Sequence, residues 1–209
     1  MSMFDLQGKV AIVTGAVTGL GQGMAVGLAQ AGADIVSVGI GDHSETESKV
    51  KALGRRFLGI DANLMSIEPI QGVVDKVVET FGKVDILVNN AGIIRRADAV
   101  DFTEKDWDDV MNINIKTVFF FSQAVAKQMI KQGQGGKIIS VASMLSFQGG
   151  IRVPSYTASK SGVMGVTRLM ANEWAKHNIN VNAIAPGYMA TANTAALRAD
   201  EARNAEIVG

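Results

Sequence analysis

Short apolar runs alternate with longer amphipathic segments along this chain, and no other feature restricts its fold as strongly. Most of the runs are nearly continuous in Val, Ile and Leu, as in parallel strands buried on both faces; they cover residues 10–13, 35–38, 56–60, 84–88, 137–141 and 179–184. The segments between them predict helices over residues 20–30, 45–53, 67–81, 104–131 and 155–176. Elements in this order predict an α/β fold with a doubly wound parallel sheet and right-handed crossovers.

The composition is that of one globular domain without an excess of either charge. The chain has 209 residues, of which 47% are hydrophobic and 19% are charged, and 20 basic residues balance 20 acidic ones. A neutral chain has no bulk electrostatic attraction for nucleic acids or anionic membranes. We therefore expect a small-molecule ligand as the partner.

Several kinds of site are excluded by residue types that the chain lacks. It has no cysteine, which excludes disulfides, Cys-ligated zinc, iron–sulfur clusters and thiol catalysis. His43 and His177 lie far apart, so no metal site is expected. No apolar run approaches the roughly 20 residues that span a bilayer, and residues 1–9 lack the apolar core of a secretory signal. These features predict a cytoplasmic protein.

The first predicted strand runs into a glycine-rich turn, with Gly15, Gly19 and Gly21 within residues 14–21. Such a turn lets backbone N–H groups approach a pyrophosphate, and the helix that follows directs its positive end at the same charge. The spacing is G-x-x-x-G-x-G rather than G-x-G-x-x-G, and it is not that of a P-loop. A purely structural turn is the alternative, but the strand–turn–helix context favours a dinucleotide.

The end of the second predicted strand bears on the choice between NAD and NADP. An acid there accepts hydrogen bonds from ribose hydroxyls, whereas a nearby Arg accommodates a 2′-phosphate. Gly39 occupies the usual acid position, and Asp42 lies slightly beyond it. Neither residues 16–18 nor residues 39–43 contain Arg or Lys. The sequence therefore predicts NAD rather than NADP.

Tyr156 and Lys160 are four residues apart at the start of a predicted helix, so they share one face. A neighbouring ammonium is expected to lower the phenol pKa from about 10, which suits an acid/base acting on an alcohol. Taken alone, such a pair is more often a solvated helix face. Ser143 strengthens the catalytic interpretation, because it follows the strand at 137–141 and would hydrogen-bond the reacting oxygen.

Two further segments follow the ends of predicted strands, and one more polar residue stands out inside a predicted helix. Asn89 to Gly92 come directly after a strand, and Pro186-Gly187 follow the last one, with Thr191 in reach of a cofactor. Ordinary turns are the alternative for both. Asn114 lies inside a predicted helix although Asn is a mediocre helix former. A local kink or a bound water linked to Lys160 would explain it, and a tolerated polar residue is the alternative.

Together these motifs resemble the short-chain dehydrogenase/reductase family, in family order and spacing. The resemblance implies a single-domain Rossmann-like fold and a catalytic tetrad of Asn114, Ser143, Tyr156 and Lys160. It also implies adenine contacts from Asp61 and Ala62, and a cofactor site that includes Tyr156 and Lys160 together with Gly15, Thr18, Gly19, Leu20, Gly21, Asn89, Ala91, Gly92, Pro186, Gly187 and Thr191. Family members assemble through long helices, so a homodimer or homotetramer is expected. They also close the sheet with a further C-terminal strand, which is absent here, so we expect residues 1–209 to form one C-terminally incomplete domain.

Within the family, residues 52–57, 92–97, 146–156 and 198–201 are similar to a group of NAD-linked dehydrogenases acting on deoxy-keto-sugar acids. A sugar acid needs a partner for its carboxylate, and Arg suits bidentate recognition. The candidates are Arg152 and Arg96, with Arg95 as an alternative and Gln148 as a polar contact. Competing hypotheses are a 3-oxoacyl-carrier-protein reductase, a gluconate 5-dehydrogenase, and a dinucleotide sensor or inactive truncated homologue.

Overall fold

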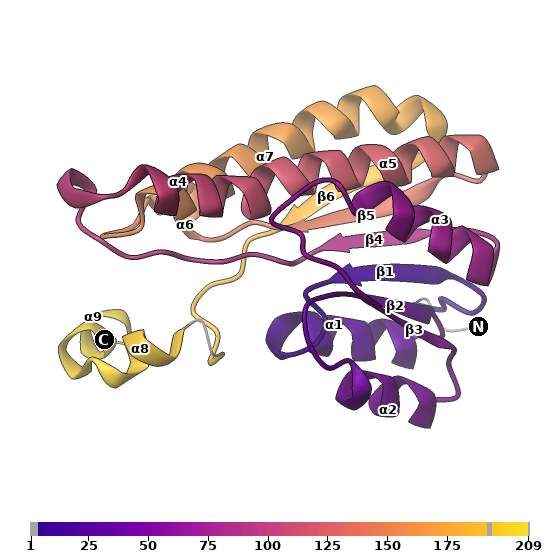
Figure 1. Cartoon of the computed structure of the whole chain (residues 1–209), viewed down its shortest axis with the longest axis horizontal. Helices are drawn as coiled ribbons and strands as arrows, with labels where there is room; N and C mark the ends of the chain where they lie inside the picture. Colours follow the sequence, from indigo (N-terminus) through magenta and orange to yellow (C-terminus); the bar gives the residue numbers. More distant parts are fainter. Residues whose placement is uncertain (1–3, 192–193, 209) are drawn as a thin grey trace.

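The sheet has six parallel strands in the order β3-β2-β1-β4-β5-β6 (Figure 1). The computed structural model describes residues 4–191 and 194–208. The strands are β1 (Val10–Thr14), β2 (Asp34–Gly39), β3 (Phe57–Asp61), β4 (Ile86–Asn89), β5 (Gly136–Val141) and β6 (Ile179–Ile184). The order reverses between β1 and β4, so a cleft opens at their carboxyl ends, where ligands of open α/β sheets bind. The predicted fold class is confirmed.

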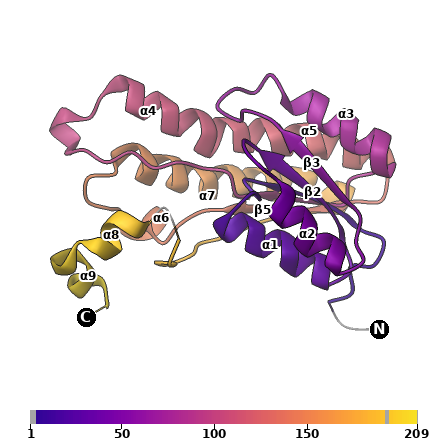
Figure 2. The ribbon, with the colours of Figure 1, turned by 60° about the horizontal axis from the view of Figure 1, so that its bottom comes forward.

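Helices cover the sheet in two groups (Figures 1 and 2). Helices α1 (Gly19–Gln30) and α2 (Ser44–Ala52) pack on one face. Helices α3 (Ile70–Phe81), α5 (Thr117–Gln132) and α7 (Pro154–Trp174) pack on the other, where α4 (Glu104–Met111) leads into α5. The shorter elements are η1 (Ala99–Asp101), η2 (Asn112–Lys116), α6 (Leu145–Gln148), η3 (Ala175–His177), α8 (Ala195–Ala199) and α9 (Glu201–Val208). None of the described helices is long and apolar enough to cross a membrane.

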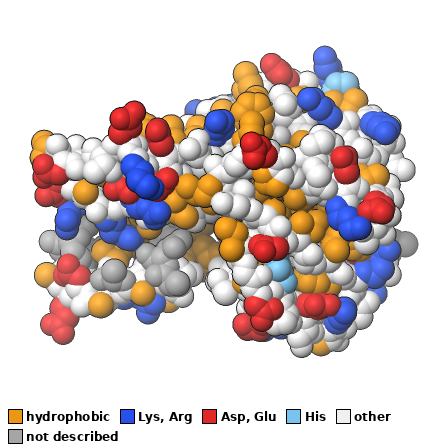
Figure 3. All heavy atoms as spheres, viewed as in Figure 1, with side chains coloured by type: hydrophobic (Ala, Val, Ile, Leu, Met, Phe, Trp, Pro, Cys, Tyr) orange, Lys and Arg blue, Asp and Glu red, His pale blue; other side chains and the backbone are white. Residues whose placement is uncertain are grey.

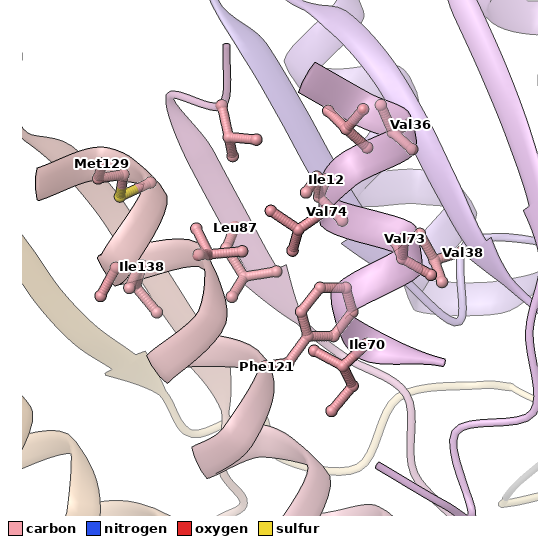
Figure 4. Packing of buried hydrophobic residues seen from close by; sticks show 14 of the residues in the cluster. Ile12, Val36, Val38, Ile70, Val73, Val74, Leu87, Phe121, Met129 and Ile138 are labelled. Atoms are coloured by element: carbon pink, nitrogen blue, oxygen red, sulfur yellow. The ribbon is translucent and has the colours of Figure 1, made fainter. Parts of the chain in front are cut away.

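The cores on the two faces of the sheet are built from side chains of different size, and this difference determines how closely α1 packs against the sheet. On the α3–α5 side, Phe121 is fully buried and points toward Ile70 and Val73 (Figure 4). On the α1 side the core is rich in alanine, with Ala25 and Ala29 of α1 packed against strand residues. Small side chains let a helix approach a sheet closely. The N-terminus of α1 therefore lies tight against the turn that follows β1.

Two helix predictions differ from the structure. The single helix predicted over residues 104–131 contains a π-helical turn, η2, which separates α4 from α5. The polar helix predicted over residues 192–209 is divided at Asp200 into α8 and α9, and residues 192, 193 and 209 lie outside the described residues. The predicted two-sided burial also fails for β6, because Asn180, Asn182 and Ile184 are exposed along it.

Basic and acidic side chains are mixed over the face shown in Figure 3, in keeping with the neutral net charge. In the same view the surface is notched between the α8–α9 segment and the body of the sheet. The functional cleft lies at the carboxyl ends of the strands.

Candidate active site

Glycines in the turn between β1 and α1 and at the start of α1 are required for two different reasons, backbone conformation and close packing. Gly15 has a φ of +64° and Gly19 a φ of +59°, both in the left-handed region. A Cβ on Gly21 would lie 2.1 Å from the carbonyl oxygen of Gly15, whereas one on Gly19 would meet nothing within 4 Å. Gly21 is therefore required for close packing and Gly19 for backbone conformation.

Thr14 and Asn90 tie this turn to the end of β4. The Asn90 amide donates to the carbonyl oxygens of Thr14 at 2.9 Å and Gly15 at 3.2 Å. In return the Thr14 hydroxyl accepts from the backbone N–H groups of Asn90 at 3.0 Å and Ala91 at 2.9 Å. The sequence predicted that the segment from Asn89 to Gly92 lies at the cofactor, but it singled out neither Thr14 nor Asn90 for these bonds. Their position at the carboxyl ends of two neighbouring parallel strands was the signal that could have identified them.

The structure does not bring the Asn89 side chain to this turn. Its amide donates to the hydroxyls of Ser122 at 2.9 Å and Ser140 at 3.3 Å, and the residue is 3% exposed. Asn89 is still within β4, where successive side chains point to opposite faces. Asn90, one residue later, reaches the cleft instead.

A first cavity lies in front of the turn, lined by Gly15, Thr18, Gly19, Leu20, Gly21, Asn90, Ala91, Gly92 and Thr191. Thr18 precedes α1 without a side-chain capping bond, so the first N–H groups of the helix are not taken up by that side chain. Backbone donors at a helix N-terminus fit a phosphate group. The site therefore fits the pyrophosphate of a dinucleotide.

Asp61 and Ala62 lie beside the end of β2, and their contact with the adenine stays a prediction. Asp61 is the strand partner of Gly39, and the Ala62 N–H donates to the Gly39 carbonyl oxygen at 3.1 Å. On the other side of the cleft the Pro186 carbonyl oxygen accepts from the Met144 N–H at 3.1 Å. Gly187 follows in the wall of a second cavity.

This second cavity contains Ser143 and Tyr156. Its other described walls are Ile94, Arg96, Met144, Leu145, Gly187, Tyr188, Thr194 and Leu197. The Ser143 side chain hydrogen-bonds Tyr156, and its oxygen also accepts from the Leu145 N–H at 3.1 Å. Arg96 is the one charged side chain among these described residues. The cavity thus presents the hydroxyls of Ser143 and Tyr156 and one cation to a ligand, with two further hydroxyl-bearing residues, Tyr188 and Thr194, in its wall.

Burial raises the pKa of Tyr156 above its ordinary value of 10.0. The Ser143 hydrogen bond and the Arg96 charge oppose this rise without cancelling it. The expectation that Lys160 lowers the phenol pKa is wrong for this structure. Its ammonium donates to the Val141 carbonyl oxygen at 2.6 Å and lies 5.6 Å from the Tyr156 ring centroid.

The pKa of the Lys160 ammonium is also shifted by its surroundings. The residue is 4% exposed, and burial lowers the pKa of its ammonium from 10.5 to about 8. Desolvation disfavours the charged form of a lysine. Lys160 is therefore close to half protonated in mildly alkaline solution.

Asn114 is fully buried in the π-helical turn η2. Its Oδ1 accepts from the Ile93 N–H at 2.9 Å, and its Nδ2 donates to the Ile93 carbonyl oxygen at 3.0 Å and the Ser159 hydroxyl at 3.2 Å. The side chain thus joins the segment after β4 to α7. The expected local irregularity is present, while a water link to Lys160 stays a prediction.

The structure separates the arginine candidates. Arg95 pairs with Asp106 at 3.4 Å and Asp109 at 3.6 Å, and Arg152 pairs with Asp98 at 2.9 Å. Neither they nor the exposed Gln148 line the Tyr156 cavity, whereas Arg96 does. Among the described residues no cluster of three His, Cys, Asp or Glu side chains is arranged to hold a metal ion.

A dinucleotide cavity beside a Ser–Tyr–Lys pocket, on a parallel sheet, defines a nicotinamide-dependent oxidoreductase. The chain belongs to the short-chain dehydrogenase family, whose profile matches residues 9–202. It is accordingly an NAD(P)-dependent oxidoreductase acting on CH–OH groups.

Named relatives are similar over the whole chain. The 2-dehydro-3-deoxy-D-gluconate 5-dehydrogenase of Escherichia coli (strain K12) is 72% identical over 208 residues, which cover 100% of this chain and 82% of the relative. The enzyme of that name from Bacillus subtilis (strain 168) is 50% identical, covering 98% and 80%. A crystal structure from Agrobacterium tumefaciens with bound NADP is 52% identical, has a TM-score of 0.92 and covers 100% and 82%. The family resemblance seen in the sequence is confirmed.

The substitution Gly21→Ala tests the packing of the turn. The added Cβ must displace the Gly15 carbonyl, so we expect NAD affinity to fall at least about tenfold and the free energy of unfolding to drop by about 1–3 kcal/mol. Gly23→Ala is the matched control, because its Cβ meets nothing within 4 Å and alanine favours the helix. Calorimetric titration with NAD and urea unfolding measure both effects. Equal NAD affinity in the two variants would contradict the packing argument.

The lowered pKa of Lys160 predicts a pH-dependent stability. Between pH 8 and 10.5 the unfolded chain binds a proton at this lysine that the folded chain does not, so the stability contribution of the site rises with pH across that window. Below pH 8 the contribution is constant and at its lowest. The difference in unfolding free energy between wild type and Lys160→Met should therefore move in favour of wild type by about 3 kcal/mol over the window.

Denaturant unfolding at a series of pH values measures this difference. The exposed Lys127, replaced by Met, is the control, and its difference from wild type should not follow this pattern. If the difference in unfolding free energy between wild type and Lys160→Met did not change with pH, the lysine would not be held in a desolvated site.

Proposed function

We propose that this enzyme uses NAD to interconvert a secondary alcohol and a ketone on a deoxy-keto-sugar acid, of the 2-dehydro-3-deoxy-D-gluconate or 2-deoxy-D-gluconate type. The observation that carries the proposal is the position of Arg96, whose guanidinium shares one cavity with Ser143 and Tyr156. An acidic substrate can then place its hydroxyl at Ser143 and Tyr156 and its carboxylate at Arg96. The names of the relatives that are 72% and 50% identical support the same substrate class.

Ser143 and Tyr156 handle the reacting hydroxyl. Ser143 donates to the substrate oxygen and keeps it beside Tyr156. In the oxidation direction Tyr156 must first lose its own proton, and as the phenolate it then accepts the hydroxyl proton as the C–H bond breaks. A nicotinamide bound in the cleft would supply the hydride acceptor. In the reverse direction Tyr156 returns the proton to the carbonyl oxygen. A phenol whose pKa is raised by burial is protonated at neutral pH, which suits it as the acid for ketone reduction.

Lys160 and Asn114 support this chemistry from behind the cavity. Lys160 has the reach to bond the nicotinamide ribose, and moving from the Val141 carbonyl to the ribose would bring its charge to bear on the cofactor side of Tyr156. Asn114 fixes the spacing between the segment after β4 and α7 through Ile93 and Ser159. The residues that line the first cavity would hold the pyrophosphate, and Asp61 and Ala62 would contact the adenosine.

The preference for NAD rests on the charges at the end of β2. Both carboxylate oxygens of Asp42 accept hydrogen bonds from Ser44, which lowers the Asp42 pKa and keeps the group anionic. An anion there opposes a 2′-phosphate, and residues 39–43 supply no Lys or Arg to offset it. Lys49, the nearby cation on α2, is already paired with Glu45 at 2.7 Å.

We also propose that the enzyme works as a homodimer or homotetramer. Large apolar side chains are exposed on the outer surfaces of the long helices, with Ile130 of α5 at 41% and Leu169 of α7 at 48%. A second copy covering these helices would bury them. The cytoplasmic location stays a prediction of the sequence.

Initial rates of nicotinamide absorbance change test the proposed function. Deoxy-gluconate-type acids, gluconate and a neutral sugar alcohol are each assayed with NAD and NADP. A 3-oxoacyl thioester is assayed with NADH and NADPH, because its ketone can only be reduced. We expect the highest kcat/KM for a deoxy-keto-sugar acid with NAD. Preference for NADPH and the acyl thioester would instead identify a 3-oxoacyl reductase, and NAD binding without turnover of any substrate would identify a sensor or an inactive protein.

Replacement of single arginines tests how the carboxylate is recognised. Arg96→Gln should raise KM for the sugar acid by about 10- to 100-fold, the effect of losing a charged hydrogen-bond partner. Arg152→Gln is the matched control, since Arg152 pairs with Asp98 outside the cavity, and it should leave KM unchanged. An Arg96 variant with wild-type KM would remove this residue from substrate recognition.

A further inference from the structure

A threonine of helix α2 hydrogen-bonds the glycine-rich turn, although it does not line either cavity of the cleft. Thr46 lies in the first turn of α2 and is fully buried. Its hydroxyl donates to the Ala16 carbonyl oxygen at 2.9 Å and lies 3.3 Å from that of Val17. A helix on the outside of the sheet thus contacts the backbone of the turn directly.

Gln22 of α1 completes the arrangement. Its Nε2 donates to the Val17 carbonyl oxygen at 3.1 Å and to the Thr46 hydroxyl at 3.0 Å. The Lys49 ammonium donates to the Gln22 Oε1 at 2.6 Å, which fixes which end of the amide faces the turn. Both N–H groups of the amide and its oxygen are therefore engaged, and each of the two turn carbonyls has a donor.

The direction of these carbonyls determines the direction of the neighbouring N–H groups. In a planar trans peptide the C=O and the following N–H point to opposite sides. The carbonyls of Ala16 and Val17 belong to the same peptides as the N–H groups of Val17 and Thr18. Because both carbonyls point toward Thr46 and Gln22, these N–H groups are turned away from α2, and Thr18 lies in the wall of the dinucleotide cavity.

We propose that Thr46 is a positioning residue for dinucleotide binding, because its hydroxyl, together with Gln22, holds the turn in the orientation that presents its N–H groups to the pyrophosphate. The residue touches the turn and not the ligand, so its effect is on affinity. It acts on the part of the cofactor that NAD and NADP share. The inference needs only the dinucleotide site and does not depend on the identity of the substrate.

Substitutions at Thr46 separate positioning from simple packing. Thr46→Ala removes the hydroxyl without adding atoms, Thr46→Val replaces it with a methyl, and Thr46→Ser keeps it. We expect the Ala and Val variants to bind NAD about three- to tenfold more weakly in calorimetric titrations, with a similar loss for NADP, and Thr46→Ser to bind like wild type. At saturating NAD the kcat and the substrate KM should stay at wild-type values.

Thr167→Val is the matched control. Thr167 is also buried, at 7% exposure, and its hydroxyl also donates to a backbone carbonyl, that of Val163 at 2.7 Å within α7. This variant should lose stability in urea unfolding as the Thr46 variants do, but keep wild-type NAD affinity. Hydrogen exchange of the amides in residues 15–21 should quicken only in Thr46→Ala and Thr46→Val.

Two results would overturn the proposal. One is a Thr46→Ala protein that loses stability like Thr167→Val and yet binds NAD with wild-type affinity, which would make Thr46 a packing residue only. The other is a Thr46→Ser protein that binds NAD as weakly as Thr46→Ala, which would show that the hydroxyl is not the group that matters.

Discussion

The site depends on the close approach of two backbone segments, the turn after β1 and the start of α1. The space between the Gly15 carbonyl and Gly21 admits no side chain, and Asn90 closes the gap from β4 with bonds to two turn carbonyls. The alanine-rich core beneath α1 permits this approach. With the helix this close, its N-terminal N–H groups reach the cleft at the switch point of the sheet, which is where a pyrophosphate is best stabilised.

The chemistry of the catalytic pocket depends instead on burial, which disfavours the charged forms of Tyr156 and Lys160. Desolvation raises the pKa of Tyr156 and lowers that of Lys160, so both groups favour their neutral forms more than they would in water. Arg96, an exposed cation at the edge of the same cavity, is the charge that acts on the phenol in this structure. A guanidinium is insensitive to this desolvation because its pKa is far above neutrality. In the proposed function, substrate recognition and acid/base chemistry therefore meet at one arginine.

The parallel sheet and most element positions were predictable, because period and residue type report directly on two-sided burial. Ser143, Tyr156 and Lys160 were predictable as neighbours for a similar reason, since a strand end and one helix face bring them together. The directions of individual side chains were harder to predict from the sequence. Asn89 and Asn90 differ only in whether β4 has ended, and the contacts of Lys160 depend on a carbonyl of another strand. Thr46 gave no signal at all, because its role comes from packing between α2 and a turn about thirty residues earlier.

We propose that Tyr156 carries the proton transfer in a pocket that is separate from the dinucleotide-binding turn. A comparison of Tyr156→Phe with wild type tests this in two measurements, the dissociation constant for NAD and the single-turnover rate of nicotinamide reduction. We expect NAD binding within about twofold of wild type and a rate lowered by at least about a hundredfold, the usual contribution of a general acid/base. A Tyr156→Phe enzyme that turns over at the wild-type rate would contradict it.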